Sequence, residues 1–458
     1  MSSTILAGID PRSFSLLVSQ KIDEPIYSHD LNILHFLEEC LNYGHCCFIS
    51  ANQYEESEIY EVYLNKGKLS YKKTGDQPKV NIILYSGLDN FALATKFPEI
   101  KHLVMQSALN FVEEARTAKP TWPKLVIEGT RKYADYIIVQ NERMKDLTDV
   151  ILSLFAGWKN PDRILVFPQS PRNDLLFKHQ GNLEEIKIRV RHKYGIPDDA
   201  LLIVNAGGVW KWTNLDKFLL QLKNFIENGH KNVYFIQPGI VQTGNHDHDE
   251  YINDLQNMIA SMQDSTRKHF ILLKGWNSER RSFEEILISS DLGINLNPDT
   301  LENWQSHRVR VLEYISAGLP TLISQEDSYY QKCPDFFIKI NLENEETFAV
   351  RLNEAFKMLE NKDIEKVKSE AQRMYSRSNS YQILAKKIDE LVSVTESPYM
   401  EKDSLLSMGE HQKVEPNLVT GKIKNYIFSH KYAYNFLNKF KILKIYKKIK
   451  SIQRKNLK

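Results

Sequence analysis

Residues 291–324 contain the pattern that most constrains the fold of this chain. Asp291 precedes a short apolar run, residues 292–296, of the kind that forms a buried parallel strand. A polar loop follows, and residues from about Ser306 to Ala317 then place apolar side chains at helical spacing. A second apolar run occupies residues 321–324. Strand, loop, helix and strand in this order predict a right-handed βαβ unit of a parallel sheet.

The loop of this unit is polar where a ligand would bind. Ligands of such sheets bind beyond the carboxyl ends of the strands, and a polar helix N-terminus can hold an anion or a polyol. Gly318 stands where the helix would end and a positive φ would be needed. The polar residues expected at this edge are Asn297, Asp299, Gln305, Ser306, His307 and Arg308.

The same alternation of strands and helices extends over most of the chain. Five apolar runs between residues 201 and 324 alternate with helical segments and predict a doubly wound parallel sheet. An earlier series, from about residue 14 to residue 168, predicts a second α/β unit. Because single cores stop growing beyond roughly 250–300 residues, a chain of 458 residues should form two or more domains. The expected fold class is α/β, with two Rossmann-like domains, 1–170 and 171–393, a linker, 394–420, and a basic helical tail, 421–458.

A glycine pair follows the first strand of the second unit. Gly207 and Gly208 would let the backbone approach a phosphate closely, and Lys211 could neutralise a diphosphate. A plain tight turn would require the same two glycines. Trp210 could form a wall of the site or simply pack against its neighbours.

These segments resemble the C-terminal half of the GT-B glycosyltransferases, particularly the large retaining family 4. The phrase at residues 313–320, EYISAGLP, is similar to the family phrase EAMAAGLP. The family has another glutamate eight residues earlier, where this chain has Gln305, so a hydrogen-bonding group is kept and a charge is removed. Residues 133–147, YADYIIVQNERMKDL, resemble the family's ADAVIVNSE phrase near the end of the first domain.

The resemblance implies a cleft between the two domains, with a nucleotide-sugar donor held by the second. Glu313 would accept hydrogen bonds from ribose hydroxyls, and the backbone at residues 275–276 would meet the nucleobase. Arg308 and Arg310 cannot share a helix face, so one of them would reach the diphosphate, and the sequence does not choose between them. The predicted catalytic residues are Lys211, Gln305 and Arg308, and the predicted donor-binding residues are Gly207, Gly208, Trp210, Gly275, Trp276, Ser306, His307, Arg310 and Glu313.

The first domain would address the acceptor, and His29, Asp89 and Asn110 are its candidate residues. A polar loop histidine such as His29 is often only solvated. The resemblance implies retention at the anomeric carbon. No metal and no other cofactor is expected, since lysine, arginine and a helix dipole can take the charge of the leaving group. His246 and His248 could suggest a metal site, but we interpret their run, GNHDHDE, as a polar loop.

The tail after residue 421 differs in composition from the rest of the chain. It interleaves lysines with aromatic and aliphatic residues and contains no Asp or Glu. This composition suits an anionic membrane surface, and packing of a basic helix on the first domain is the alternative. Nucleic-acid binding is a rival for any basic stretch, but the rest of the chain is balanced in charge and offers no nucleic-acid-binding module, so we expect no nucleic-acid partner.

The expected location is the cytoplasm, peripheral on the inner face of the cytoplasmic membrane. We find no signal peptide and no run near the ~20 apolar residues that a membrane span needs. The four cysteines lack disulfide or metal spacing, and Cys46 and Cys47 are expected to be buried in a strand.

The predicted function is transfer of a sugar from a nucleotide-sugar to a glycan or lipid-linked acceptor, in synthesis of cell-surface polysaccharide. One alternative is a non-catalytic GT-B-like protein that binds a nucleotide-sugar or a partner, which the amide at Gln305 would favour. The other is a nucleotide-sugar epimerase, for which we identify no suitably placed acids. The transferase hypothesis requires the turn at Gly207 and the helix that begins near Ser306 to converge on one pocket.

Overall fold

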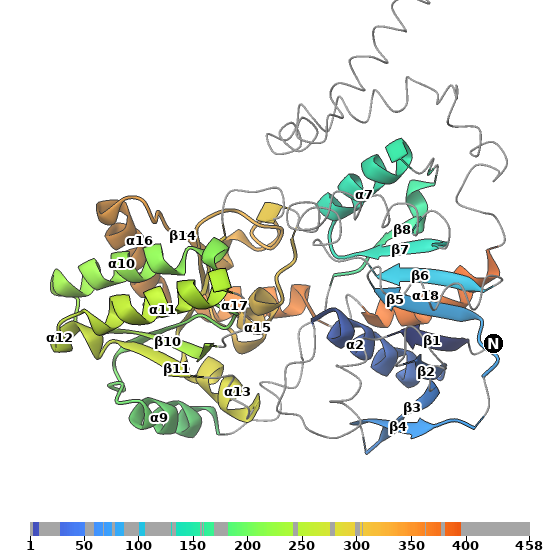
Figure 1. The fold of residues 1–458 in the computed structure, drawn as a ribbon, viewed down its shortest axis with the longest axis horizontal. Helices are drawn as coiled ribbons and strands as arrows, with labels where there is room; N and C mark the ends of the chain where they lie inside the picture. The colour runs from blue at the N-terminus through green and yellow to red at the C-terminus, as the bar shows by residue number, and fades with distance from the viewer. Residues whose placement is uncertain are drawn as a thin grey trace, which may run out of the picture.

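The protein consists of two α/β lobes, each built on one sheet (Figure 1). The computed structural model describes residues 3–8, 28–50, 59–66, 68–75, 78–86, 100–105, 130, 134–155, 158, 160–168, 182–240, 246–274, 280–297, 303–304, 306–361, 363–376 and 381–394. Within these residues, no helix combines the length and the apolar character needed to span a membrane.

The first lobe contains an eight-stranded sheet in the order β4-β3-β2-β1-β5-β6-β7-β8. The pairs from β2 to β8 are parallel, whereas β3 pairs antiparallel with both β2 and β4, so the β3–β4 hairpin forms an antiparallel edge. The polar composition of residues 52–78 predicts a surface hairpin or an insertion, and β3 and β4 form a hairpin within this segment. The strands are β1 (Thr4–Gly8), β2 (Cys46–Ser50), β3 (Ile59–Asn65), β4 (Lys68–Lys73), β5 (Ile82–Ser86), β6 (Lys101–Met105), β7 (Tyr136–Val139) and β8 (Ile164–Val166).

Among the described N-terminal residues, this lobe contains the helices α2 (Ser28–Asn42) and α7 (Glu142–Phe155), together with the 3-10 turn η1 (Pro161–Arg163). Helix α2 buries Ile33, Phe36 and Leu37 against the sheet. Cys47 is buried as expected, but the expectation is wrong for Cys46, which is exposed. Cys46 is the first residue of β2, at the end of the strand and outside the apolar clusters on both faces of the sheet.

The second lobe contains a six-stranded, fully parallel sheet in the order β11-β10-β9-β12-β13-β14. This is the doubly wound order 3-2-1-4-5-6, and it confirms the predicted parallel sheet with one strand more than the five runs counted. The strands are β9 (Leu201–Val204), β10 (Val233–Ile240), β11 (Phe270–Lys274), β12 (Leu292–Asn295), β13 (Thr321–Ile323) and β14 (Phe337–Lys339).

Helices cover both faces of this sheet. One face packs against α10 (Leu215–Glu227), α11 (His246–Ala260) and α16 (Glu345–Glu360), and the other against α9 (Leu183–Lys193), α13 (Arg280–Ser289) and α15 (Val309–Ala317). The shorter elements of the lobe are η2 (Lys211–Thr213), α12 (Asp264–Arg267), η3 (Pro334–Phe336) and α17 (Ile364–Met374).

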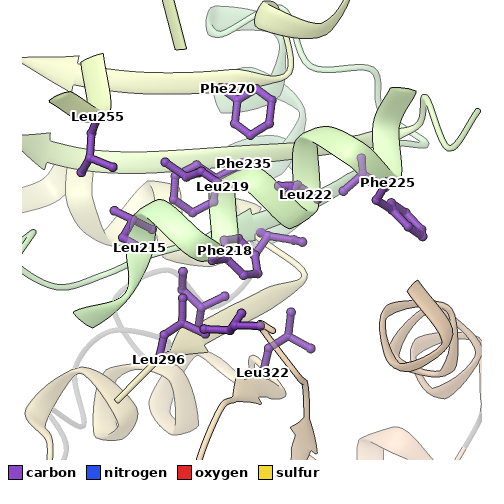
Figure 2. Packing of buried hydrophobic residues seen from close by; sticks show 14 of the residues in the cluster. Leu215, Phe218, Leu219, Leu222, Phe225, Phe235, Leu255, Phe270, Leu296 and Leu322 are labelled. Carbon is purple, nitrogen blue, oxygen red and sulfur yellow. The ribbon is translucent and has the colours of Figure 1, made fainter. Parts of the chain in front are cut away.

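The core on the α10 face follows directly from the spacing of apolar residues along α10. Leu215, Phe218, Leu219, Leu222 and Phe225 recur every three or four residues and form one buried stripe (Figure 2). The stripe packs on inward-pointing side chains of neighbouring strands, among them Phe235, Phe270, Leu296 and Leu322.

The last described helix, α18 (Tyr381–Ser393), returns to the first lobe. Its ring Tyr381 meets Phe36 of α2 edge-on, with centroids 5.9 Å apart, and the His45 ring lies 2.9 Å from the carbonyl oxygen of Ala385. In Figure 1 this orange-red helix lies among the blue elements of the first lobe. Residues 381–393, which the sequence analysis grouped with the second domain, therefore pack on the first.

Three further expectations can be compared with the described elements. The strand expected at residues 14–18 lies outside the described residues, whereas β1 lies in a segment that the sequence left uninterpreted. Residues 362–393, expected as one helix, form α17 and α18. The polar loop expected at His246 and His248 is wrong, because both residues lie in the first turn of α11.

Candidate functional site

The strand order of the second sheet reverses between β9 and β12, and this point defines the candidate site. In open α/β sheets, ligands bind beyond the carboxyl ends of the strands at the point where the order reverses. Gly207 follows β9, Asn297 follows β12, and α15 begins close to both. The two segments on which the hypothesis depends therefore leave the same edge of the sheet.

Gly207 and Arg310 meet at this edge. A Cβ atom added to Gly207 would lie 2.3 Å from Cζ of Arg310, so only glycine leaves room for the guanidinium. The Nη1 atom of Arg310 donates a hydrogen bond to Oδ1 of Asn205, at 3.2 Å. Burial, together with the neighbouring charge of Arg308, lowers the pKa of Arg310, although Tyr314 and Glu313 oppose this. Among the described residues Arg310 forms no ion pair, so its positive charge is available to an anion.

Two buried amides hold this arrangement from behind. Asn205 donates from Nδ2 to Oε1 of Gln237, at 2.7 Å, and both side chains are buried. Gln237 in turn donates from Nε2 to the carbonyl oxygens of Gly207 and Gly239, both at 3.0 Å. Sequence reasoning missed both amides. The available signal was a polar residue placed directly after an apolar strand run, as in LLIVN and VYFIQ.

Tyr314 fixes the position of α15 against the sheet. Its hydroxyl accepts a hydrogen bond from the N–H of Ala206, at 2.8 Å, and lies 3.0 Å from the carbonyl oxygen of Ile294 and 3.3 Å from that of Val204. Its ring fills the space above Gly293, where a Cβ atom would come within 2.6 Å. Burial raises the pKa of Tyr314 to about 12, so the hydroxyl keeps its proton at neutral pH. Tyr314 thus sets the register of α15 that brings Arg310 to the Gly207 turn.

The structure separates the two arginines between which the sequence could not choose. Arg310 lies at the Gly207 turn, whereas the guanidinium of Arg308 lies over the Trp212 ring, 4.7 Å from its centroid. Arg308 also precedes the first residue of α15, and its carbonyl oxygen accepts a hydrogen bond from the Tyr329 hydroxyl, at 2.9 Å. The structure therefore places Arg310 closer than Arg308 to the predicted diphosphate position.

Glu313 lies one helical turn beyond Arg310. Residues three apart share a helix face, and the side chains of Arg310 and Glu313 are both half-buried. Glu313 is therefore not enclosed in the apolar core, which would have ruled out its predicted role.

Lys211 and Trp210 flank the glycine turn on the other side. Lys211 begins η2 and is exposed. Trp210 is 40% exposed, and its ring lies on that of His248, with centroids 4.3 Å apart. A Cβ atom on Gly208 would come within 2.7 Å of Nε1 of Trp210. Both glycines of the turn thus have a side chain directly above them.

Ser306 and His307 are buried within the loop that leads into α15. The Ser306 hydroxyl donates to the carbonyl oxygen of Asn303, at 3.1 Å, and the Ser306 carbonyl oxygen accepts from the Ser328 hydroxyl, at 2.8 Å. Because the Ser328 hydroxyl has a single proton, Nδ1 of His307, 3.3 Å away, carries the proton of that contact. The His307 ring stacks on Tyr329, with centroids 4.0 Å apart. These contacts order the loop, and the predicted contacts with sugar hydroxyls stay predictions.

Several predicted residues lie outside the part of the chain that the structure describes. They are Gln305, Gly275, Trp276, Asp89 and Asn110, together with the side chain of His29, whose backbone belongs to the first turn of α2. Within the described residues, no three His, Cys, Asp or Glu side chains gather as a metal site.

A contact between the lobes, which the sequence did not indicate, borders the site. Arg143 of α7 donates from Nη1 to the carbonyl oxygen of Trp304, at 2.7 Å, and its guanidinium lies 4.9 Å from the centroid of the Trp304 ring. Trp304 is buried two residues before Ser306. The loop that leads into α15 is therefore held from the first lobe as well as from its own.

Comparison with known proteins agrees with this architecture. No family model matches the sequence, and no curated protein matches it. The E. coli trehalose-6-phosphate structure bound with UDP-2-fluoro glucose is similar in fold, with a TM-score of 0.59 and 12% identity, over 86% of this chain and 100% of that chain.

Two other solved structures are similar over most of their length. The α,α-trehalose-phosphate synthase (UDP-forming) from Burkholderia vietnamiensis has a TM-score of 0.59 and 11% identity, over 86% of this chain and 98% of that chain. A glycosyltransferase from Rickettsia africae has a TM-score of 0.55 and 11% identity, over 85% of this chain and 98% of that chain. The chain therefore has the GT-B fold of two Rossmann-like domains, as the sequence predicted. Identities of this size establish the fold alone.

Proposed function

We propose that this protein is a glycosyltransferase that moves a sugar from a nucleotide-sugar donor to an acceptor. One observation carries the proposal: an arginine without an ion-pair partner among the described residues, Arg310, lies against the Gly207 turn at the carboxyl edge of the second sheet. Glu313 stands on the same helix face one turn further. A guanidinium and a carboxylate in this order can bind the diphosphate and the ribose of one nucleotide. Two proteins of similar fold are described with UDP-2-fluoro glucose or as UDP-forming.

In the proposed reaction, Arg310 and the backbone at Gly207 hold the diphosphate, and Lys211 contributes a second positive charge as the sugar leaves. Glu313 accepts hydrogen bonds from the ribose hydroxyls. Transfer proceeds with retention of the anomeric configuration, and the leaving phosphate accepts the proton of the acceptor hydroxyl. The chain's own cations therefore replace the charge that a metal ion would supply.

The finer proposal concerns the family and the acceptor. The EYISAGLP phrase supports membership of family 4 and a role in cell-surface polysaccharide synthesis. A glycan or a lipid-linked sugar is then the acceptor. The basic, aromatic-rich residues 421–458 would bring the enzyme to an anionic membrane surface, on its cytoplasmic side, where such acceptors are found.

The test is nucleotide release from a panel of UDP-, GDP- and TDP-sugars, with and without a lipid-linked acceptor. Release that requires the acceptor, with the anomeric configuration of the product retained, supports retaining transfer. Formation of an epimer without acceptor would identify an epimerase. Nucleotide-sugar binding without turnover would identify a non-catalytic binding protein.

The donor site is tested by Glu313→Ala, which should abolish nucleotide-sugar binding measured by calorimetry. Glu365→Ala is the matched control, because Glu365 is an exposed helical glutamate, on α17, that pairs with Lys368. Full activity of Glu313→Ala would refute the site. Removal of residues 421–458 should leave the lobes folded and reduce sedimentation with vesicles of phosphatidylglycerol and phosphatidylcholine. Unchanged sedimentation would refute the membrane proposal.

A further inference from the structure

Two cavities border α10 and α16, and the larger one also reaches the carboxyl edge of the sheet, where Asn297 and Ser324 follow β12 and β13. The two helices run side by side in Figure 1. The larger cavity, of about 580 Å³, is lined by residues that include Asn214, Lys217, Asn297, Ser324, Asn341 and Thr347. The smaller cavity, of about 360 Å³, is lined by residues that include Gln221, Phe225, Asn228, His230 and Glu345. We call these lining residues the α10–α16 seam.

The seam follows one face of α10. Asn214, Lys217, Gln221, Phe225 and Asn228 recur at intervals of three or four residues, so they share a helix face. At about 1.5 Å of rise per residue they extend over about 21 Å. This length suits an elongated ligand of several linked units better than one small molecule.

Asn297, which lines the larger cavity, has a buried acceptor that receives no hydrogen bond from the described residues. Asp327 can only accept, so Asn295 must donate to it from Nδ2, at 2.9 Å, and its own Oδ1 then accepts from Nδ2 of Asn297, also at 2.9 Å. These two successive hydrogen bonds fix the orientation of the Asn297 amide. Its Oδ1 atom is left buried without a donor, in a side chain that is 2% exposed. A buried carbonyl oxygen without a donor costs about 1–3 kcal/mol, which a ligand hydroxyl would recover.

The smaller cavity repeats the same chemistry. Gln221 donates from Nε2 to the carbonyl oxygen of Leu342, at 3.0 Å, which fixes its amide orientation. Its Oε1 atom is also buried, and no residue in the described part of the chain donates a hydrogen bond to it. Beside it, the exposed His230 ring stacks on Phe225, with centroids 3.9 Å apart and ring planes 7° apart. A flat aromatic surface of this kind packs well against the C–H face of a sugar ring.

The charges of the seam argue against an anionic ligand. Its cations are already paired with carboxylates: Lys217 with Glu343, Lys339 with Glu326, and Arg351 with Glu354. The two unmet groups are acceptors and need ligand hydrogens, which a phosphate or a carboxylate does not provide. We propose that the α10–α16 seam binds a neutral oligosaccharide, through hydroxyls that donate to Asn297 and Gln221. Neither cavity is lined by Gly207 or Arg310, and the proposal does not depend on sugar transfer.

The test is titration of the full chain with maltohexaose, cellohexaose and N-acetylchitohexaose, followed by saturation-transfer NMR. Thr347→Tyr fills the larger cavity from an exposed position without touching the amide chain, and Gln221→Met removes the acceptor of the smaller one. Each should weaken binding at least tenfold. Gln256→Met, a half-buried glutamine on the neighbouring helix α11, is the matched control and should bind like the unaltered protein.

The remaining outcomes separate this site from the alternatives. Arg310→Gln should weaken nucleotide binding and leave oligosaccharide binding unchanged, so the two proposals can fail separately. The seam proposal is overturned if none of the three oligosaccharides binds, which would mean that the cavities hold only water. It is also overturned if Thr347→Tyr and Gln221→Met bind normally, or if heparin binds in place of the neutral sugars.

Discussion

Gly207 is the residue on which the proposed donor site can be tested most directly. Gly207→Ala would place a methyl group on the guanidinium of Arg310, whose flexible end can swing away without disturbing the core. The fold should therefore survive. Nucleotide affinity should fall about tenfold, because one charge-assisted hydrogen bond contributes about 1.5–3 kcal/mol. Calorimetric titration with the nucleotide of the preferred donor measures the loss.

Gly75→Ala is the control for this substitution, since nothing lies within 4 Å of its added Cβ atom. It should bind nucleotide like the unaltered chain. Equal affinities for Gly207→Ala and the unaltered protein would show that Arg310 does not meet the phosphates.

His307 should give the folded protein a measurable pH dependence. Burial, with the nearby charge of Lys332, lowers the pKa of His307 to about 3 from the usual 6.5. Between these values only the unfolded chain binds the proton, so this group makes the folded state less stable as the pH falls through that window. His307→Phe keeps a ring against Tyr329 and removes the titration. The stability of the unaltered protein relative to the variant should therefore decline from pH 7 to pH 4.

Urea denaturation of both proteins at several pH values measures this difference. Burial raises the pKa of Asp327 to about 6, which acts in the opposite sense over part of the window. Both proteins contain Asp327, so its contribution largely cancels in the comparison. A relative stability that stays constant over the window would contradict the neutral, buried state of His307.

The residue scale is also where prediction from the sequence stopped. The glycine pair and Glu313 could be singled out because their type and spacing are informative by themselves. The choice of Arg310 over Arg308 could not be made, since it depends on which side of α15 faces the Gly207 turn. That orientation is set by Tyr314, whose hydroxyl partners are backbone groups from two strands. Because almost every residue carries the same backbone N–H and C=O groups, the sequence does not indicate which of them a side chain will bond.

At the scale of elements, periodicity predicted most of the second lobe. Helix α10 and the strands β9, β12 and β13 lie where their apolar spacing placed them, and Gly318 ends α15 with φ at 66°. The start of α11 was missed because its first turn, HDHDE, contains no apolar residue and resembles a loop. In the structure His248, in this first turn, packs against the Trp210 ring, with the ring planes 39° apart.

The seating of α15 on the sheet can be tested through the Tyr314 hydroxyl. Tyr314→Phe leaves the buried N–H of Ala206 without its acceptor, so unfolding free energy should fall by about 1–3 kcal/mol. Nucleotide affinity should fall as well, since Arg310 depends on the register of α15. Chemical denaturation and calorimetry measure the two effects.

Tyr234→Phe is the matched control, because Tyr234 is a buried tyrosine in the same sheet whose ring packs against His269. It should change stability by less than Tyr314→Phe and leave nucleotide binding unaltered. If both variants behave alike, Tyr314 contributes only its ring to packing.

At the scale of the whole molecule, α18 connects the end of the described chain to its beginning. Periodicity predicts that a helix buries one face, but it does not say which sheet receives that face. The sequence therefore could not show that α18 packs beside α2. The contact between His45, just after α2, and Ala385 of α18 joins residues that are 340 positions apart in the chain. Among the described residues, the hydrogen bond from Arg143 of α7 to Trp304 also connects the two lobes. Substitutions in the buried face of α18 should therefore lower the stability of the first lobe.

Two adjacent residues of α18 provide the test of this arrangement. Leu384 is fully buried in the core of the first lobe, whereas Ile383 is 38% exposed. Leu384→Ala should lower unfolding free energy by about 2–5 kcal/mol, because it leaves a cavity, and Ile383→Ala should have little effect. Hydrogen exchange should rise in α2 and not in α10, since α18 packs on the former. Equal destabilisation by the two variants, or faster exchange in α10, would place α18 on the second lobe, as the sequence alone had suggested.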